Sequence, residues 1–478
     1  METLQRTANR GSISTGYDID NSLKIEADNA ERMQRTYANI TSAGTPTSTK
    51  IATISFWLKR TELQPSGNHL CFLADSNFTW VGFSNDGIYV LGSTAGINLR
   101  SSGKFRDTSA WYHIVVAFDT TQSTASNRVK VYVNGEQWTE FGVSENYGTQ
   151  NNDIDLYDTN TSHYLGWSDA QSQSGYYSEF YLIDGQQLAP TEFGEFDSNS
   201  GIWKPKTYGG TFGVQGYHLD FEDSSALGAD VSGNGNNFTA LYNITSADQA
   251  TDTPTNNFAT GNNLAVFSNP STLVLTEGQT KIAKTANGWE TLSSTIAVTS
   301  GKWYMEMQNI VMPESAMMSV FPADIEFIGA GGQVNNYAGK VSGDGGISYY
   351  SYNGYVFQNA GNSSYGTAWA NETNTMAIAL DMDNGKVYFA RANTWQNSGD
   401  PTSGATGTGA IDLIEPSKPH MMGYSIYANN TSGAVNFGGY TPSSISSAAT
   451  DANGYGTFEY APPSGYYALC TKNLAEYG

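Results

Sequence analysis

Short segments that alternate between apolar and polar residues recur along the sequence, and no helical period of useful length accompanies them. In "ISFWLKR", Ile54 and Leu58 fall on the same side of a strand. Residues 111–119, "WYHIVVAFD", are apolar on both faces, as in a central strand between two layers. "RVKVYVNGEQW" contains Asn134 and Gly135, which supply the two positive-φ positions of a type I′ hairpin turn. This pattern predicts an all-β protein of the β-sandwich class.

The alternating segments fall into two regions of a chain of 478 residues, a length that favours two or three domains. Residues 21–245 and 276–478 each predict one jelly-roll or β-sandwich domain. Residues 246–275 have little apolar periodicity and are punctuated by proline, so we expect a linker or an arm there. Residues 1–20 are polar and predict a tail, either disordered or an anchor that orders on a partner.

The stretch "GYHLDFEDSSALGADVSGNGNNFTA", residues 216–240, begins as a strand and then becomes rich in Asp, Ser, Gly and Asn. We expect its half-strand to close the first sandwich by pairing with early strands. Gly233 and Gly235 would then supply positive φ in an exit turn. The stretch therefore predicts a domain boundary.

The charge balance narrows the possible partners. The formal net charge is −22 and only 14% of residues are charged. A nucleic-acid partner is not expected, because phosphate binding requires a basic face. No run of about 18 apolar residues predicts a membrane span, and the N-terminus lacks the apolar core of a secretory signal. We expect folding in a cytoplasm, neutral partners, and buried free thiols at Cys71 and Cys470.

Three groups of motifs resemble known families. "ISFWLKR", "WYHIVVAFD" with "VKVYVNGE", "HYLGW" and "SEFYLIDGQQLAPTEFGEF" occur in the order of the concanavalin A-like, laminin-G-type jelly roll. "GKWYMEM" and "NTMAIALDMDNGKVYFARANTW" resemble a SPRY-type sandwich in the second region. Residues 181–260, which end with "DQATDTPTNNFAT", resemble structural proteins of tailed, particularly marine, bacteriophages.

The phage resemblance implies a virion protein, made in the host cytoplasm, that contacts other virion proteins. It implies a fibre, appendage or tail component presenting lectin-like domains to host-surface glycan. A homo-oligomer, and a trimer by analogy with fibres, is the expected state. The alternative is a capsid decoration or cement protein that uses the same folds for particle contacts. A polysaccharide depolymerase is the third and least favoured reading.

No catalytic set is complete in the sequence. A retaining glycosidase needs two carboxylates about 5–5.5 Å apart. "PADIEFIG" provides Asp324 and Glu326, but Pro322 occupies the position where a preceding strand carboxylate would stand. There is no Gly-x-Ser-x-Gly elbow, P-loop or His-Glu-x-x-His motif. His113 lies within a predicted strand, where we expect a satisfied core imidazole. The sequence therefore predicts a protein that is not an enzyme.

Two kinds of candidate binding residue remain. Calcium takes six to eight oxygen ligands, and clustered carboxylates at a sandwich rim are candidates for it, against the alternative of solvated acidic loops. The candidate calcium ligands are Asp153, Asp155, Asp158, Asp220, Asp223 and Asp230. Aromatic side chains near predicted turns could stack on sugar rings, against the alternative that each packs in a core or a subunit interface. The candidate glycan contacts are Trp80, Trp138, Trp167, Tyr177, Tyr350, Tyr352, Tyr355 and Trp369.

Overall fold

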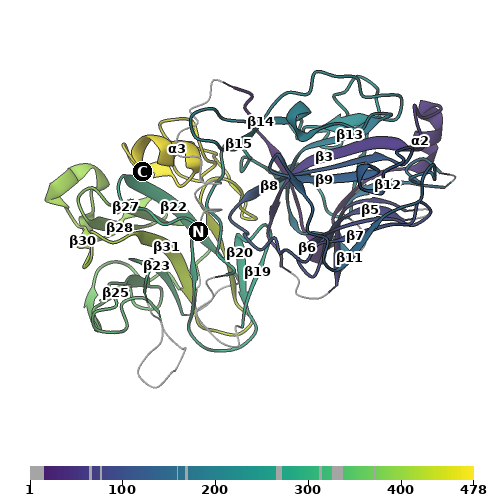
Figure 1. Cartoon of the computed structure of the whole chain (residues 1–478). Helices are drawn as coiled ribbons and strands as arrows, with labels where there is room; N and C mark the ends of the chain where they lie inside the picture. Colours follow the sequence, from purple (N-terminus) through teal and green to yellow (C-terminus); the bar gives the residue numbers. More distant parts are fainter. Residues whose placement is uncertain are drawn as a thin grey trace. The chain divides into compact units, whose positions relative to one another are not determined.

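The structure is a computed structural model that divides into two compact units, one ending at Asn256 and the other beginning at Asn257. Figure 1 shows that both are built from strands, which confirms the predicted all-β class. The described residues are 16–63, 67–75, 78–158, 160–166, 171–264, 272–311, 315–325, 337–370 and 372–478, without the side chains of 309–310. Among them, no helix is long and apolar enough to span a bilayer.

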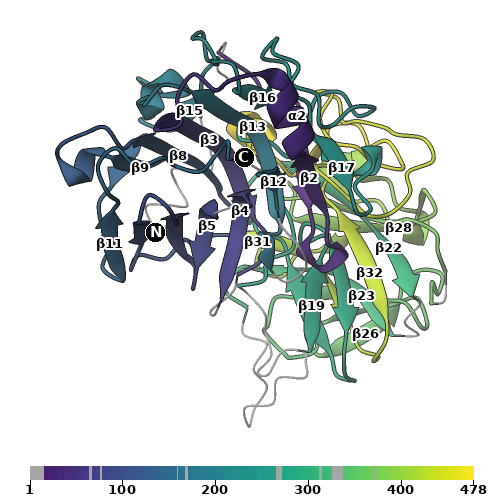
Figure 2. The same ribbon diagram turned by 90° about the vertical axis from the view of Figure 1, so that its right-hand side faces the viewer.

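The first unit contains two eight-stranded antiparallel sheets. We call one the β8 sheet; its order is β10 (Glu136–Trp138), β9 (Val129–Val133), β8 (Trp111–Asp119), β3 (Ile51–Arg60), β13 (Gly175–Asp184), β1 (Ser22–Ile25) and β18 (Gln249–Ala250), with β16 (Tyr217–Leu219) also on β13. We call the other the β5 sheet; its order is β11 (Ser144–Tyr147), β7 (Ile97–Arg100), β6 (Gly87–Gly92), β5 (Thr79–Ser84), β4 (Asn68–Ala74), β12 (His163–Leu165), β2 (Arg32–Arg35) and β17 (Thr239–Leu241). Figure 2 shows β4, β12 and β2 of the β5 sheet beside one another.

A single apolar core lies between these sheets, as the alternation predicts. It contains Ile54 and Leu58 from β3 and alternate residues of β8, β5 and β6. Asn134 and Gly135 both have positive φ, which confirms the predicted hairpin turn between β9 and β10. Short helical turns lie outside the sheets: α2 (Tyr37–Ala43) and the 3₁₀ turns η1 (Ala27–Asn29), η2 (Ala125–Asn127), η4 (Pro190–Glu192) and η5 (Ser246–Asp248).

The outer face of the β8 sheet is covered by the chain that follows β13. That segment includes the hairpin β14 (Gly194–Phe196) and β15 (Trp203–Pro205), and its Phe193 and Tyr208 pack on Tyr181 of β13. Trp203 donates its indole N–H to Nδ1 of His113 at 3.0 Å, so the imidazole Nε2 donates to Oγ of Ser55 at 2.9 Å. Burial lowers the pKa of His113 to about 3. His113 is a neutral core residue, as predicted.

The segment predicted to be a linker belongs instead to the two domains. β18 pairs with β1, and Asp252 is an ion-pair partner of Lys59 at 2.6 Å. Beyond the boundary at Asn256, Phe258 is buried in the second unit. The physical reason is that polar residues here satisfy buried partners, which apolar periodicity does not reveal. Residues 265–271 lie outside the described part of the chain.

Residues 216–240 do not end the first domain, contrary to the prediction. The predicted half-strand is β16, which pairs with β13. After it, β17 adds to the β5 sheet beside β2. Gly233 and Gly235 do have positive φ, at 90° and 74°. They turn the chain within the domain.

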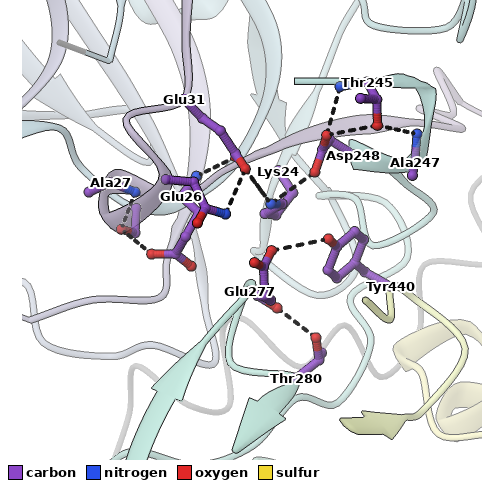
Figure 3. Close-up of polar contacts among 12 residues, drawn as sticks. Lys24, Glu26, Ala27, Glu31, Thr245, Ala247, Asp248, Glu277, Thr280 and Tyr440 are labelled. Atoms are coloured by element: carbon purple, nitrogen blue, oxygen red, sulfur yellow. Dashed lines mark hydrogen bonds and ion pairs between the residues drawn. The ribbon is translucent and has the colours of Figure 1, made fainter. Parts of the chain in front are cut away.

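Buried charges hold the last part of the first unit to its first strand. Lys24 of β1 contacts Glu31 at 3.1 Å and Asp248 at 2.8 Å (Figure 3). Asp248 also accepts from the backbone N–H of Thr245, whose hydroxyl caps the η5 turn by accepting from the N–H of Ala247. Of the predicted tail, residues 1–15 are outside the described part. Ile19 is buried and its backbone N–H donates to Thr255, so the end of that tail packs on the domain.

The second unit is also a two-sheet sandwich. We call its first sheet the β22 sheet; its order is β19 (Leu273–Thr276), β20 (Lys281–Lys284), β32 (Ser432–Asn436), β22 (Lys302–Val311), β27 (Met376–Asp381), β28 (Lys386–Arg391) and β29 (Thr394–Trp395), with β30 (Ile411–Asp412) on β28 and β33 (Tyr467–Ala468) on β22. We call the second the β23 sheet; its order is β21 (Glu290–Ser293), β31 (His420–Ile426), β23 (Ala316–Pro322), β24 (Ile347–Tyr350), β25 (Tyr355–Gln358) and β26 (Gly361–Ser364). The turns η6 (Gln396–Ser398) and η7 (Pro401–Thr406) and the helix α3 (Thr471–Tyr477) complete it.

The hairpins that the sequence predicted in this unit are present as β24–β25 and β27–β28. Its core contains Trp303, Tyr349 and Trp369 between the two sheets. Glu277 and Tyr440, also of this unit, make a polar contact of 3.4 Å that Figure 3 shows. Cys71 and Cys470 are both free and buried, as expected.

Candidate functional site

One transverse row of side chains crosses the outer face of the β5 sheet. Directly paired residues of an antiparallel sheet share a face, so strand register defines the row. It runs through Gln34, Tyr164, Leu73, Trp80, Leu91 and Asn98, from β2 to β7. Because Met33, Phe72, Val81, Val90 and Leu99 on the same strands point into the core, this row faces away from it. We call it the β5-sheet face.

Aromatic rings form the centre of the β5-sheet face. Trp80 meets Tyr89 edge to face with centroids 5.3 Å apart. Tyr164 accepts a hydrogen bond from Nε2 of Gln34 at 2.7 Å. Trp80 also packs against the small cluster of Leu70, Leu73 and Tyr164. Burial raises the pKa values of Tyr89 and Tyr164, so both phenols are neutral hydrogen-bonding groups. Such amphipathic rings combine an apolar surface with a polar end.

Polar groups lie on both sides of these rings. The Cζ atom of Arg100 lies 4.4 Å from the ring centroid of Tyr89. The guanidinium also donates hydrogen bonds to Asn68, at 3.4 Å, and to Ser84. The guanidinium of Arg32 lies 4.1 Å from the ring centroid of Tyr242 and 5.8 Å from that of Tyr164. Trp80 Nε1, Asn98 Oδ1 and Arg100 Nε are shielded polar atoms without a hydrogen-bond partner in the described residues. Shielded groups of this kind are costly unless a ligand or water satisfies them.

Of the three candidate glycan residues of the first unit that the structure describes, Trp80 alone is placed on this face. Trp138 packs against Phe105 at 4.9 Å and donates to Ser101, so it is a packing residue. Tyr177 is fully buried in the core, and its assignment as a glycan contact is wrong. Trp167 lies outside the described residues. No sequence pattern points to Tyr89, Tyr164 or Arg100, because only strand pairing brings them beside Trp80.

A second aromatic cluster lies on the β23 sheet of the other unit. The ring centroid of Trp289 lies 5.1 Å from that of Tyr337, 5.5 Å from that of Tyr427 and 5.9 Å from that of Tyr350. Tyr350 also lies 6.2 Å from Tyr352, whose side chain is 64% exposed. We call this the Trp289 cluster. It includes two of the predicted residues.

The other two candidates of the second unit differ in position. Tyr355 is 36% exposed at the start of β25. Trp369 is fully buried among core residues such as Tyr349, so its assignment as a glycan contact is also wrong. Proximity to a turn does not determine on which side of a sheet a ring points.

The first calcium group is only partly assembled. Asp155 is 2% exposed; Oδ2 accepts from the backbone of Thr94 at 3.1 Å, while Oδ1 has no partner that meets hydrogen-bond criteria. Burial, with a smaller contribution from the adjacent Asp158, raises the pKa of Asp155 to about 6. Asp153 instead accepts from Oγ1 of Thr49 at 2.6 Å. The adjacent carboxylates of Asp155 and Asp158 therefore fit part of a calcium ligand set.

The second calcium group serves local turns. Asp230 accepts from the backbones of His218 and Ser232 through Oδ1, and from Asn236 through Oδ2. Asp223 accepts from Ser225, and Asp220 from the backbone of Glu222. Among the described residues, no group of three or more potential metal ligands includes these carboxylates. Their prediction as one calcium site is not supported, because each is directed to its own turn.

The carboxylate considered for catalysis is engaged elsewhere. Asp324 forms an ion pair of 3.1 Å with Lys418, and Glu326 lies outside the described residues.

Comparison with protein families identifies the first unit. Residues 33–186 match the model described as the concanavalin A-like lectin/glucanases superfamily. The first unit is similar to concanavalin A-like domains over these residues. This domain holds both the aromatic row and the Asp155–Asp158 pair.

Solved structures of SPRY domains are among the similar folds. The SPRY domain of human HERC1 shares 10% identity, with 37% of this chain and 96% of that chain covered and a TM-score of 0.28. A human SPRY domain shares 7% identity, with coverages of 34% and 94% and a TM-score of 0.25. Stonustoxin shares 14% identity, with coverages of 37% and 27% and a TM-score of 0.27. A comparison with curated proteins found no match.

Proposed function

We propose that this chain is a non-enzymatic glycan-recognition protein of a tailed bacteriophage virion. It would serve as a fibre, appendage or tail component, assembled with other virion proteins as a homo-oligomer. Lectin-like domains are suited to binding carbohydrate or protein. The resemblance of residues 181–260 to phage structural proteins supports the virion assignment.

The observation that carries glycan binding is the β5-sheet face. Trp80 carries a half-buried ring in this row, the ring of Tyr164 is buried beside it, and Asn98 and Gln34 carry half-buried amides. A sugar ring offers C–H groups to an aromatic surface and hydroxyls to amides. Ligand sites commonly combine apolar rings with a few convergent polar groups in this way.

Calcium has a secondary place in this proposal. Asp155 and Asp158 would supply carboxylate oxygens, and backbone carbonyls or water would complete the coordination shell. Bound calcium would neutralise two adjacent carboxylates, one of which is buried. It would therefore stabilise the loop that carries them.

The direct test is binding of the purified full-length protein to an array of bacterial surface polysaccharides, with calcium and with a chelator. We expect binding, and a loss of about tenfold or more in affinity for Trp80→Ala, as for a central aromatic contact. Phe196→Ala is the matched control, because Phe196 is an aromatic residue, 48% exposed, on the β14 hairpin. Binding unaffected by Trp80→Ala would exclude the β5-sheet face.

The virion assignment and the lack of catalysis have separate tests. Mass spectrometry of purified particles from a phage that encodes this chain should detect it. A low-resolution map should show a few outward-pointing copies. Hundreds of copies on the head, with both domains in contacts, would instead establish the cement function. A fall in polysaccharide viscosity during incubation would establish a depolymerase.

A further inference from the structure

The β5 sheet differs in charge from the rest of the chain. The whole sequence has 45 Asp and Glu against 23 Lys and Arg. Within the bounds of the eight β5-sheet strands, the charged residues are Arg32, Arg35, Arg100 and a single acid, Glu145. The sign of the charge on this sheet is therefore opposite to that of the chain.

Strand register separates these charges between the two sides of the sheet. Arg35 is fully buried and donates to Gln215 and Asn236, so it is a structural residue. Glu145 lies on the edge strand opposite Leu99, which points into the core, and therefore does not belong to the outward row. Arg32 and Arg100 are the strand charges on the β5-sheet face. A carboxylate at its margin, Asp75, flanks Tyr164 and accepts from the backbone of Ser162 at 2.7 Å.

The environment of Arg100 differs from that of Arg60 and Arg391, which are paired with carboxylates. Arg60 pairs with Asp86 at 3.1 Å, and Arg391 pairs with Glu372 at 2.5 Å. Arg100 instead donates to the neutral oxygens of Asn68 and Ser84, with no ion pair among the described residues, and its Nε has no hydrogen-bond partner there. Its plane lies on Tyr89, which fixes the guanidinium without neutralising it.

The two arginines stand near opposite ends of the row. Five strand-to-strand steps separate β2, which carries Arg32, from β7, which carries Arg100. At roughly 4.8 Å a step this is a span of about 24 Å. Trp80 and Tyr164 lie between them. A planar guanidinium is well matched to carboxylate or sulfate oxygens, to which it donates two hydrogen bonds at once.

We propose that the ligand of the β5-sheet face is an acidic polysaccharide, one that bears carboxylate or sulfate groups on its sugars. The chain would cross the strands between Arg32 and Arg100, with a sugar ring on the half-buried Trp80. This proposal rests on the proposed function and adds the class of glycan. It departs from the neutral partner that the net charge of −22 predicts. Local arginines, rather than net charge, set the sign of the contact.

The test compares a neutral polysaccharide with its sulfated form and with a second polymer that bears carboxylates. Binding of the full-length protein to dextran, dextran sulfate and polygalacturonate is measured by biolayer interferometry at two salt concentrations. We expect at least one of the two acidic polymers to bind tenfold or more tightly than dextran, more weakly at high salt. Binding by dextran sulfate alone identifies a sulfate contact, and by polygalacturonate alone a carboxylate contact.

Three variants separate this inference from the proposed function. Arg100→Gln should reduce acidic-polymer binding about tenfold and flatten the salt dependence, whereas Arg100→Lys should keep part of that dependence. Arg106→Gln is the matched control, because its side chain is 53% exposed and pairs with Asp86 away from the row. If neutral glycans bind equally well, and Trp80→Ala abolishes binding while Arg100→Gln does not, the acidic class is wrong and glycan recognition stands. If neither variant changes binding, the site itself is wrong. Equal binding of single-stranded DNA would also overturn the inference, since it would show unspecific attraction to polyanions.

Discussion

Replacing Asp252 with Ala tests whether the segment after residue 245 is an integral part of the first domain. Asp252 is 1% exposed; its carboxylate contacts Nζ of Lys59 at 2.6 Å and accepts from the indole N–H of Trp111 at 3.0 Å. Lys59 is fully buried, and burial lowers its pKa, an effect that Asp252 opposes. Without the carboxylate, an ammonium group and an indole N–H would lose a buried partner.

Breaking a buried ion pair by removing one partner costs about 3–5 kcal/mol. For a domain of this size each kcal/mol lowers the midpoint of thermal unfolding by roughly 2–4 °C, so we expect a decrease of about 6–20 °C. The assay is differential scanning calorimetry of the full-length variant. Asp223→Ala is the control, because Asp223 is exposed and accepts only from its local turn.

A double variant, Lys59→Met with Asp252→Leu, should recover most of the loss. Apolar side chains of similar volume often replace a buried pair without a large cost. A decrease below about 1 kcal/mol for Asp252→Ala would refute the reasoning, since exposed ion pairs have that value. The segment would then behave as the linker that the sequence predicted.

Two further predictions concern the other candidate sites. The pKa of Asp155 in the folded protein, about 6, lies above its ordinary value of 3.8, so the folded state binds more protons between these pH values. In a chelator, stability should therefore fall by about 1–3 kcal/mol as pH rises from 4 to 6. Asp155→Asn should remove this loss of stability. At pH values above 6, calcium should raise the temperature midpoint of unfolding of the wild type. A wild-type midpoint that does not change with pH would contradict the prediction. Tyr352→Ala should leave stability unchanged and weaken any glycan binding by the Trp289 cluster. Trp369→Ala should instead lower the free energy of unfolding by about 3–5 kcal/mol, with no selective effect on glycan binding. Calorimetry measures the stability of both variants, and the glycan array measures their binding.

The sequence predicted the local features well because they depend on neighbouring residues. Asn134 and Gly135 form the expected turn, and the alternation in β3 places Ile54 and Leu58 in the core. His113 was correctly placed inside a strand. These features follow from backbone geometry and a period of two, which are readable without knowing the partners of each strand.

The errors arise where strand pairing decides. In β13 the register shifts between Ser178 and Tyr181, and Glu179 has a positive φ of 51°. Tyr177 precedes the shift and faces the core because it pairs with Leu58, whereas beyond the bulge Phe180 and Leu182 take the inward positions. The β5-sheet face was missed for the same reason. Its members are distant in sequence, and only register aligns them.

The pairing of β1 with β18 places the two ends of the first domain beside each other at one edge of a sheet. A domain that the chain enters and leaves at one place can be inserted into a loop of another protein, or exchanged for a different domain, without disturbing its neighbours. The same pairing joins the earliest and latest strands of the domain, so the sandwich can close only after about 250 residues have left the ribosome. The first domain therefore has the properties of an exchangeable module that completes its folding late in synthesis.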